Sequence, residues 1–334
     1  MISIAVTQDD VAARAGVSRA AVSFALRNSP KVSVAQRAHI RRVADELGYR
    51  PNVNASRLAS SSTGTIGVVF SDLHNLLYAD ALDGFARGLA AGSEQLLLAS
   101  GFHDPTRERA AVESFLSHRV NGIALLGSQL PAAEIQQLAR EVPTVVAGRR
   151  VDAVDWVAVD DTAGAALATE HLISLGHRRI AHIDGGGGAG AALRREQFLT
   201  TMRSHRLARQ ATVADGDYTE SGGRSAARQL LTATHPPTAI FSANDLSALG
   251  VLAATRSLRL RVPGDVSVVG FDNTTIAQLD FVGLSTIDYA RQEMGERTLE
   301  LLNSRIADPT QPARNITLAP TLIIRTTTGP VQTR

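Results

Sequence analysis

Cysteine is absent from the 334 residues of the chain, which excludes disulfide bonds, thiol nucleophiles and cysteine metal sites. No apolar run approaches the ~20 residues that a membrane-spanning helix needs. The first residues, MISIAVTQDD, also lack the basic segment, the long apolar segment and the cleavage site of a signal peptide. We therefore expect a cytoplasmic protein, and its length and 44% hydrophobic composition predict more than one core.

Lysine is nearly absent as well, since Lys31 is the only one. With no cysteine and four tyrosines, few groups titrate between about pH 7 and 9, so the isoelectric point near 9.4 overstates a net charge of +2. The charge is unevenly distributed: residues 1–60 contain nine basic and four acidic side chains, which leaves 25 basic and 28 acidic ones for the rest. A basic N-terminal segment before a slightly acidic body favours a nucleic-acid contact at the N-terminus.

Three short helices are predicted in this basic segment. Thr7 with Asp10 forms a capping box that opens the first, and Ser18 caps the second after a turn that contains glycine. Ser33 with Gln36 forms another capping box, which opens the third. Two short helices joined by such a turn are typical of a helix-turn-helix motif, although any small helical bundle can have the same spacing.

The outward face of the second helix, SRAAVSFALRN, has an unusual phenylalanine between a serine and an arginine. In a major groove, Arg19 can donate two hydrogen bonds to a guanine, Ser23 can bond a base or a phosphate, and Arg27 can bond a phosphate. Phe24 can pack on a thymine methyl group, or alternatively fold back onto the third helix or a partner subunit. The predicted DNA contacts in this segment are Thr7, Ser18, Arg19, Ala20, Ser23, Phe24 and Arg27.

Several longer motifs carry a family resemblance. They are DVAARAGVSRAAVSFALRN and VSVAQRAHIRRVADELGYRPN near the N-terminus, then HLISLGHRRIAHI, SANDLSALGVL and RVPGDVSVVGFDN downstream. In this order, the motifs resemble those of LacI/GalR-family transcriptional repressors. The resemblance extends from residue 7 to residue 327 and implies a small all-α helix-turn-helix headpiece followed by an effector-binding domain.

The same resemblance implies a hinge helix in the segment RPNVNASRL, which orders on operator DNA and inserts Leu58 into the minor groove. Ser56 stands where family members commonly carry arginine, so we expect Arg57 to make that phosphate contact. Phe24 likewise replaces the arginine or similar polar residue that is commonest at its position. The predicted contacts of the hinge are Asn52, Ala55, Arg57 and Leu58.

From Thr65 onward, short apolar runs alternate with helical segments, as in TIGVVF, QLLLAS, GIALLG, TVVAG, WVAVD, RIAHID, TAIFSA and VSVVGF. Buried strands separated by helices predict α/β architecture with doubly wound parallel sheets. In such sheets, ligands bind beyond the carboxyl ends of the strands, where this sequence places many polar residues. These are Asp72, His103, Asp104, Arg149, Asp160, Asp161, Asn244, Asp245 and Asp272. One such residue alone is more often a helix cap, but so many together favour a polar pocket.

The resemblance implies that this region folds like a periplasmic binding protein, with an effector between two lobes. Arg194 in AALRREQF matches the family arginine that grips the effector, and Tyr78 lies where the first lobe often stacks an aromatic ring. The predicted effector contacts are Asp72, Tyr78, Arg149, Asp160, Arg194, Tyr218, Asn244 and Asp272. Carboxylates, an amide and an arginine around aromatic faces suit a sugar, although they also suit a nucleoside.

The expected domains follow from these motifs. They are a helix-turn-helix domain at 1–49, a hinge helix and linker at 50–62, and an effector-binding and dimerisation domain at 63–329. Within the last, we expect lobe 1 at about 63–161 and 290–319, and lobe 2 at about 162–289 and 320–329.

Two other classes of function compete with this interpretation. GGGGAG, from Gly185, formally contains the dinucleotide-binding pattern, but a glycine run matches that pattern trivially and no acidic residue ends a second strand about 20 residues later. No hydrolase elbow or metalloprotease motif is present, so we expect no enzyme activity, no cofactor and no metal site. A secreted sugar-binding protein is the stronger rival, and the basic segment and the lack of an export signal argue against it.

We therefore expect a repressor that binds a pseudo-palindromic operator as a homodimer. A small molecule, a sugar or a sugar derivative, controls its operator affinity, with a nucleoside or purine as the alternative. The sequence leaves open whether the effector weakens or strengthens operator binding.

Overall fold

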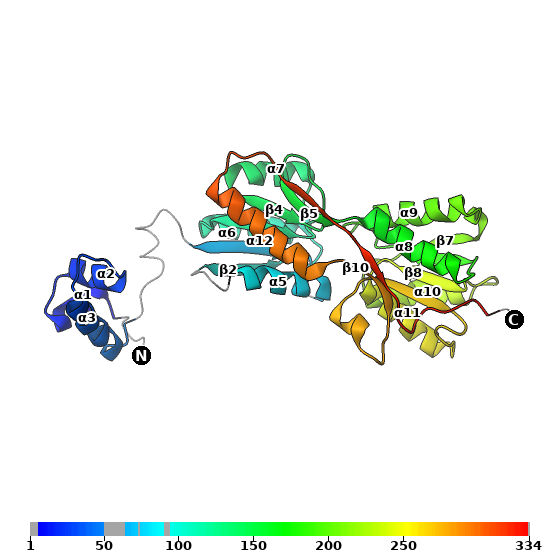
Figure 1. Ribbon diagram of the computed structural model, residues 1–334, viewed down its shortest axis with the longest axis horizontal. Coiled ribbons are helices and arrows are strands. Elements are labelled where there is room, and N and C mark those ends of the chain that lie inside the picture. The colour runs from blue at the N-terminus through cyan, green and yellow to red at the C-terminus, as the bar shows by residue number, and fades with distance from the viewer. Residues whose placement is uncertain (1–5, 50–63, 73, 90–93, 333–334) are drawn as a thin grey trace. The chain divides into compact units, whose positions relative to one another are not determined.

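The computed structural model describes residues 6–49, 64–72, 74–89 and 94–332. Contacts divide the chain into two compact units, one up to Thr63 and one from Gly64 onward. Figure 1 labels many of the helices and strands of each unit. No helix in the described ranges is long and apolar enough to cross a membrane.

The first unit contains a three-helix bundle, which we call the headpiece. Its helices are α1 (Gln8–Ala15), α2 (Arg19–Leu26) and α3 (Val34–Glu46). Val11, Val22 and Ile40, one from each helix, are fully buried at its centre. The Thr7 capping box is confirmed, whereas Ser33 only accepts a hydrogen bond from the Gln36 backbone, which is one half of the box that the sequence predicts.

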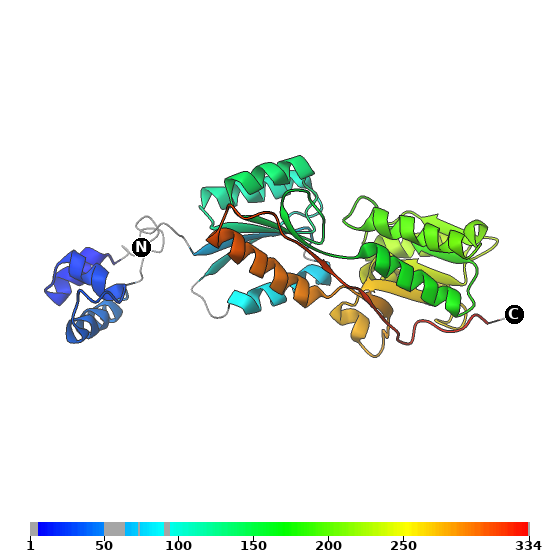
Figure 2. The same cartoon turned by 45° about the horizontal axis from the view of Figure 1, so that its top comes forward.

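The second unit contains two six-stranded sheets (Figures 1 and 2). The first has the order β11-β5-β4-β3-β1-β2 and consists of β1 (Thr65–Phe70), β2 (Gln95–Ser100), β3 (Gly122–Leu126), β4 (Thr144–Ala147), β5 (Asp155–Val159) and β11 (Asn315–Leu318). The second has the order β12-β10-β9-β8-β6-β7 and consists of β6 (Ile180–Ile183), β7 (Ala211–Ala214), β8 (Ala239–Ser242), β9 (Ser267–Asp272), β10 (Ser285–Asp288) and β12 (Thr321–Ile323).

Helices cover both faces of each sheet, so the predicted doubly wound α/β architecture is confirmed (Figure 2). The first sheet with its helices is called the first lobe, and its helices are α5 (Leu76–Leu89), α6 (Pro105–Ser117), α7 (Ala132–Glu141) and α12 (Arg291–Ala307). The second sheet with its helices is the second lobe, and its helices are α8 (Asp161–Ser174), α9 (Ala191–Ser204), α10 (Glu220–Leu231) and α11 (Asp245–Ser257), with short 3₁₀ turns at Ala208–Gln210 and Thr275–Gln278.

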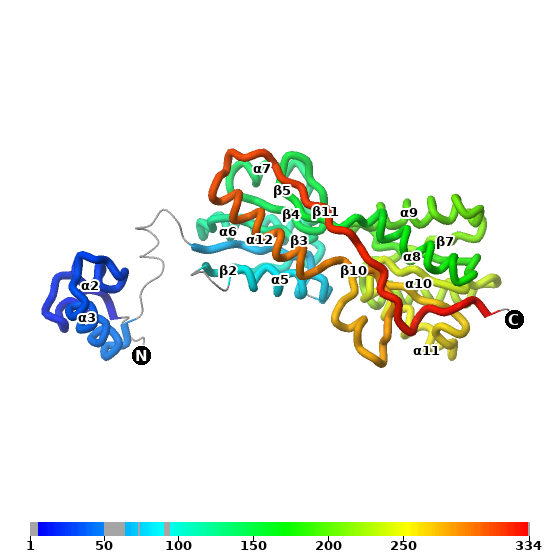
Figure 3. The backbone as a smooth tube through the Cα atoms, in the orientation of Figure 1, coloured from blue at the N-terminus to red at the C-terminus, as the bar shows by residue number. Residues whose placement is uncertain are grey.

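The chain passes between the lobes after β5, after β10 and after β11 (Figure 3). The last passage explains the one departure from parallel pairing, since β12 runs antiparallel to β10. The parallel strands of each sheet end at the edge that faces the other lobe. A chain that continues straight from β11 into the second sheet therefore runs opposite to its new neighbours. Only two residues, Ala319 and Pro320, separate β11 from β12, so the chain has no room to reverse.

Helices α5 and α12 of the first lobe cross in very close contact. Gly84 lies against the backbone of Gln292, and Gly295 lies against the backbone of Ala81, so a side chain at either glycine would collide with main-chain atoms. Such close backbone approach requires glycine. The two helices are therefore packed as one unit over the sheet.

Candidate functional site

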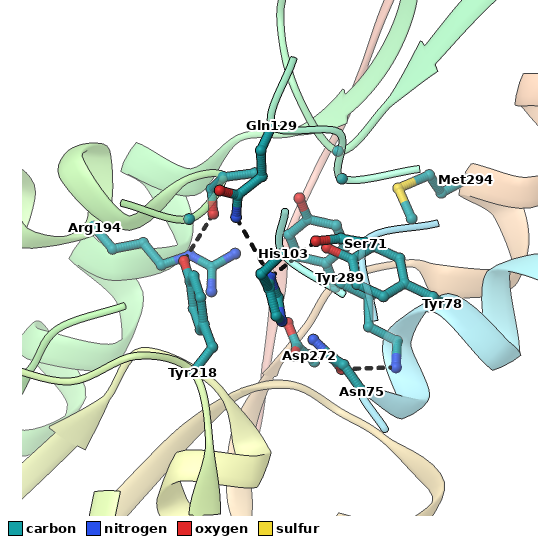
Figure 4. A pocket seen from close by; sticks show the side chains of 15 residues that line it. Ser71, Asn75, Tyr78, His103, Gln129, Arg194, Tyr218, Asp272, Tyr289 and Met294 are labelled. Carbon is teal, nitrogen blue, oxygen red and sulfur yellow. Dashed lines mark hydrogen bonds between the residues drawn. The ribbon is translucent and has the colours of Figure 1, made fainter. Parts of the chain in front are cut away.

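Polar side chains from both lobes converge between the carboxyl ends of the two sheets (Figure 4). Its free cavity volume is about 30 Å³, which is room for about one water molecule. The polar residues that line it are Ser71, Asn75, Tyr78, His103 and Gln129 from the first lobe, Arg194, Tyr218 and Asp272 from the second, and Tyr289 after β10. We call this site the cleft pocket.

Arg194 is held in the first turn of α9 with its charge offset inside the protein. Its Nε and Nη2 atoms lie 2.9 and 2.8 Å from Asp161 Oδ1, and Nη1 donates to the carbonyl of Ala243. The guanidinium carbon is 3.7 Å from the centroid of the Phe271 ring, and the side chain is only 3% exposed. Burial opposes the charged form, but Tyr218, Asp161 and the other acidic neighbours outweigh it and raise the pKa of Arg194 above its ordinary value.

Asp272 is the last residue of β9, and its carboxylate faces the same pocket. The residue is 1% exposed, and neither carboxylate oxygen has a hydrogen-bond partner within the described part of the chain. Burial raises the pKa of Asp272 well above its ordinary value, although Arg194 acts in the opposite direction. A buried polar group without a partner costs free energy, so this carboxylate is placed to accept hydrogen bonds from a ligand.

Three tyrosines fill much of the pocket. The Tyr218 hydroxyl donates to the carbonyl of Ala189 at 2.7 Å, and Tyr289 packs edge-on against Phe271 with 5.9 Å between ring centroids. Burial raises the pKa values of Tyr78, Tyr218 and Tyr289, so their hydroxyls stay protonated at neutral pH. A ligand the size of a monosaccharide therefore enters only if these rings or the lobes move.

The wall of the first lobe is a hydrogen-bonded chain centred on His103. The Nδ1 atom of this ring lies 2.9 Å from Ser71 Oγ and 3.4 Å from Gln129 Nε2, while Nε2 lies 3.5 Å from Asp72 Oδ2. Burial raises the pKa of Asp72, but its hydrogen bonds to His74 and the nearby His103 outweigh this, and the net pKa is lowered. Apart from Asp72 behind it, this wall offers the Ser71 hydroxyl, the His103 ring and the Gln129 amide as hydrogen-bonding groups.

The structure brings four of the eight predicted effector residues to the pocket lining. These are Tyr78, Arg194, Tyr218 and Asp272. The other four, Asp72, Arg149, Asp160 and Asn244, lie next to it and do not line it.

Each of these four has a supporting contact. Asp160 caps α8 and Asn244 caps α11, as single polar residues after strands commonly do. Asn244 also donates to the backbone carbonyl of Tyr218 at 3.2 Å. Arg149 donates to the carbonyls of Ser128 and Leu130, and so holds the loop next to Gln129.

Sequence reasoning did not select Ser71, Asn75, His103, Gln129, Asp161 or Tyr289 as site residues. His103 and Asp161 were within reach, since both belong to the polar residues that follow predicted strands. Tyr289 follows β10, a strand of four residues whose apolar pattern is too short to be recognised.

In the headpiece, Arg19 and Ala20 on α2 are exposed, and Arg19 Nε lies 3.8 Å from Asp9. The side chain of Arg27 donates to Ser23 Oγ at 2.7 Å. Phe24 is only partly exposed, since it packs on the headpiece core and Lys31 Nζ lies 5.1 Å from the centre of its ring.

Two predicted DNA contacts also have structural roles. Thr7 caps α1 and Ser18 caps α2. The predicted hinge contacts Asn52, Ala55, Arg57 and Leu58 lie outside the described residues.

Comparison with known proteins agrees with both units. The model of bacterial regulatory proteins of the lacI family matches residues 7–52, and that of a periplasmic binding protein-like domain matches residues 169–328. The ribose operon repressor of Escherichia coli K12 is 33% identical over 332 residues, covering 96% of this chain and 98% of the relative. The regulator GalR of the same organism is 31% identical over 324 residues, covering 96% and 94%.

Solved structures give the same result. The lac repressor dimer bound to operator and the anti-inducer ONPF has a TM-score of 0.87 at 26% identity, covering 98% of this chain and 100% of the other. A complex of the regulator CelR with cellobiose has a TM-score of 0.70 at 30% identity, covering 96% and 99%.

Proposed function

Because the chain belongs to the lacI family of bacterial regulatory proteins, it is a DNA-binding transcriptional repressor under effector control, and we propose that its effector is an uncharged sugar bound in the cleft pocket. The observation that carries this proposal is the pair of unpartnered oxygens on Asp272. Vicinal hydroxyls of a sugar donate two hydrogen bonds to one carboxylate, while the faces of the tyrosines suit its C–H groups. The relatives are regulators rather than enzymes, and this chain is not an enzyme.

The charge of the pocket argues against a phosphorylated effector. Arg194 is the one arginine of the pocket lining, and Asp161 already offsets it. A phosphate would bring negative charge next to Asp272 in a site with little solvent, where repulsion is weakly screened. A neutral sugar avoids this cost.

A purine or nucleoside is the second candidate, since the rings of Tyr78, Tyr218 and Tyr289 offer faces for a base. A base also presents N–H donors that suit Asp272. Some relatives carry the name PurR. The sugar is preferred because hydroxyls can bond both the Asp272 carboxylate and the hydrogen-bonding groups of the wall around His103.

For the DNA interface, we propose that residues 1–49 form the helix-turn-helix domain, with α2 in the major groove. Arg19 and Ala20 face the bases, and Ser23 and Arg27 lie next to them on the same helix. The contacts of Phe24 with the core and with Lys31 support the packing alternative for part of its ring. Residues 50–62 are the proposed hinge and linker, and residues 63–329 the proposed effector domain.

The proposed active form is a homodimer, which a pseudo-palindromic operator requires. The lobe boundaries are taken at about 63–161 with 290–319, and 162–289 with 320–329. The sugar populates whichever arrangement of the lobes binds it better, and operator affinity changes by the same coupling free energy. Since the operator is chromosomal, we infer a cytoplasmic location from this function.

Thermal unfolding of the full chain tests the effector, because a ligand of the folded state raises the melting temperature. The probes are D-ribose, D-galactose, cellobiose and inosine, each sugar paired with a phosphate ester where one exists. We expect a free sugar to raise the melting temperature and its phosphate ester not to. Stabilisation by the phosphate esters alone would contradict the uncharged class.

A further inference from the structure

An ion pair of the first lobe lies directly behind Asp272. Arg291, the first residue of α12, has its Nε atom 2.8 Å from Asp80 Oδ2 on α5, and the two side chains are only 10% and 15% exposed. The Nη1 atom of Arg291 donates to the backbone carbonyl of Asp272 at 2.8 Å. Asp80 Oδ1 in turn accepts from Thr275 Oγ1 of the second lobe at 3.4 Å.

We propose that Arg291 is a positioning residue of the cleft pocket, which holds Asp272 for the effector from the opposite lobe. Asp80, Arg291, Asp272 and Thr275, here called the interlobe clasp, form a ring of contacts that crosses between the lobes twice. The role in effector binding rests on the function proposed above. The clasp also holds the two lobes together, and this second role does not depend on the proposed function.

The backbone at Asp272 needs such support. Asp272 has φ of 115° and Asn273 has φ of 53°, two successive non-glycine residues in the left-handed region. Residues in this region are strained and persist only where the surroundings hold them. Arg291 holds the carbonyl of Asp272, and Arg325 Nη2 holds the side chain of Asn273 at 2.7 Å. Without Arg291, the backbone carbonyl of Asp272 loses the hydrogen bond that the first lobe supplies, while Asn273 and Thr274 keep their contacts within the second lobe. The part of the turn next to the Asp272 carboxylate is then held less firmly.

The clasp is mounted on the two helices with the closest packing in the first lobe. Asp80 precedes Ala81, and Arg291 precedes Gln292, the residues whose backbones lie against Gly295 and Gly84. A displacement of Asp272 that pulls on Arg291 therefore moves α5 and α12 together. Arg291 therefore couples the cleft pocket to the first lobe through one specific contact, in addition to any closing movement of the two lobes.

The chain offers a matched control on the same two helices. Arg87 and Glu296 also pair α5 with α12, at 3.4 Å, but they are about half exposed, and no hydrogen bond or ion pair joins them to the described part of the second lobe. A variant of this pair reports the effect of losing one α5–α12 ion pair without touching the clasp.

The absence of cysteine makes the test direct. Cysteines introduced as Ala133→Cys in α7 and Ser225→Cys in α10, both exposed positions, carry spin labels on the two lobes. Labelled chain is diluted into excess unlabelled chain, and pulsed electron resonance measures the distance between lobes. No effector is needed for this measurement.

We expect a narrow distance distribution in the parent and in Arg87→Gln. Arg291→Gln should add a population at longer distance, and Thr275→Ala, which leaves no buried charge unpaired, should add a smaller one. Circular dichroism spectra of each variant serve as the control that it is folded. Equal distributions for Arg291→Gln and Arg87→Gln in folded protein would overturn the clasp.

Calorimetric titration with D-ribose, D-galactose and cellobiose tests the positioning role. Arg291→Gln should weaken the sugar that binds the parent by roughly 5- to 100-fold, whereas Arg87→Gln should bind it as the parent does. Unchanged affinity in Arg291→Gln would overturn the positioning role. If none of the three sugars binds the parent, the proposed effector fails, while the distance measurement still decides the clasp.

Discussion

The two lobes share one strand order and differ in how their cleft walls handle charge. The first lobe presents Ser71, His103 and Gln129 as hydrogen-bonding partners around the pocket. The second lobe presents Arg194, which Asp161 pairs, and Asp272, whose carboxylate has no partner among the described residues, and both are almost fully buried. Equivalent backbones thus support different walls: the first is held by its own hydrogen bonds, and the second keeps a buried carboxylate that a ligand can satisfy.

The second lobe also buries a carboxylate outside the pocket lining. Asp245, at the start of α11, accepts three hydrogen bonds from Thr274 and Thr286, yet burial still raises its pKa to about 6. Asp245 lies behind Asp272 and raises the pKa of Asp272 further. The comparison predicts that stability and effector binding oppose each other at Asp272 and are nearly independent in the first lobe.

The largest expected effect comes from breaking the buried pair of the second lobe. Arg194→Met leaves Asp161 as a buried unpaired charge and should lower the free energy of unfolding by about 3 to 5 kcal/mol. The double variant Arg194→Met with Asp161→Asn should recover much of this loss, because no charge is then left alone. Urea unfolding monitored by circular dichroism measures both. A double variant no more stable than the single one would show that the charge pair is not the source of the loss.

Asp272→Asn should act in the opposite direction. Because the folded pKa of Asp272 lies above the unfolded one, the folded state binds more protons, and the contribution of this group to stability falls as pH rises above the ordinary range of a carboxyl group. The asparagine variant lacks this loss, so it should be more stable than the parent at pH 8, by about 1 to 3 kcal/mol, and closer to the parent at acidic pH.

Melting temperatures of both proteins across pH 4 to 8 check this, in steps of about one unit. The same variant should lose sugar binding. An asparagine variant that is less stable than the parent at every pH would contradict a cost of burying the carboxylate.

The headpiece supplies a contrast in which charge is exposed and does not stabilise the fold. Arg19→Ala should leave the melting temperature unchanged and weaken operator binding by about 1 to 3 kcal/mol, with relaxed preference at one base. Binding isotherms on an operator selected from random inverted repeats measure this. Unchanged affinity and base preference would remove Arg19 from the recognition surface.

The smallest effect on stability is expected in the wall of the first lobe. Gln129→Ala removes a weak contact of 3.4 Å to His103 and should change the free energy of unfolding by no more than about 0.5 to 1 kcal/mol. It should nevertheless change which of ribose, galactose and cellobiose binds best. A loss of stability as large as that of Arg194→Met would erase the difference between the lobes.

The fold was largely predictable because central strands such as β1, β3 and β4 are buried on both faces and several helices begin with clear caps, as at Thr7, Ser18 and Asn244. The pocket was predictable only in part. A polar residue at the carboxyl end of a strand either caps the next helix, as Asp160 does, or faces the cleft, as Asp272 does, and the sequence pattern is the same in both cases. The role of Arg291 had no signature in the sequence, since Asp80 lies far from it along the chain and only the helix crossing brings them together.

The link between β11 and β12 limits what this repressor can accept. Leu318 and Thr321 stand three residue steps apart, so at full stretch their Cα atoms are separated by no more than about 11 Å. Pro320 further restricts how that span bends. This link ties the two lobes together on one side. The lobes must therefore open by rotating about the link and cannot simply move apart. The link therefore bounds how far the lobes can separate here, and with it the size of the ligand that the cleft pocket admits.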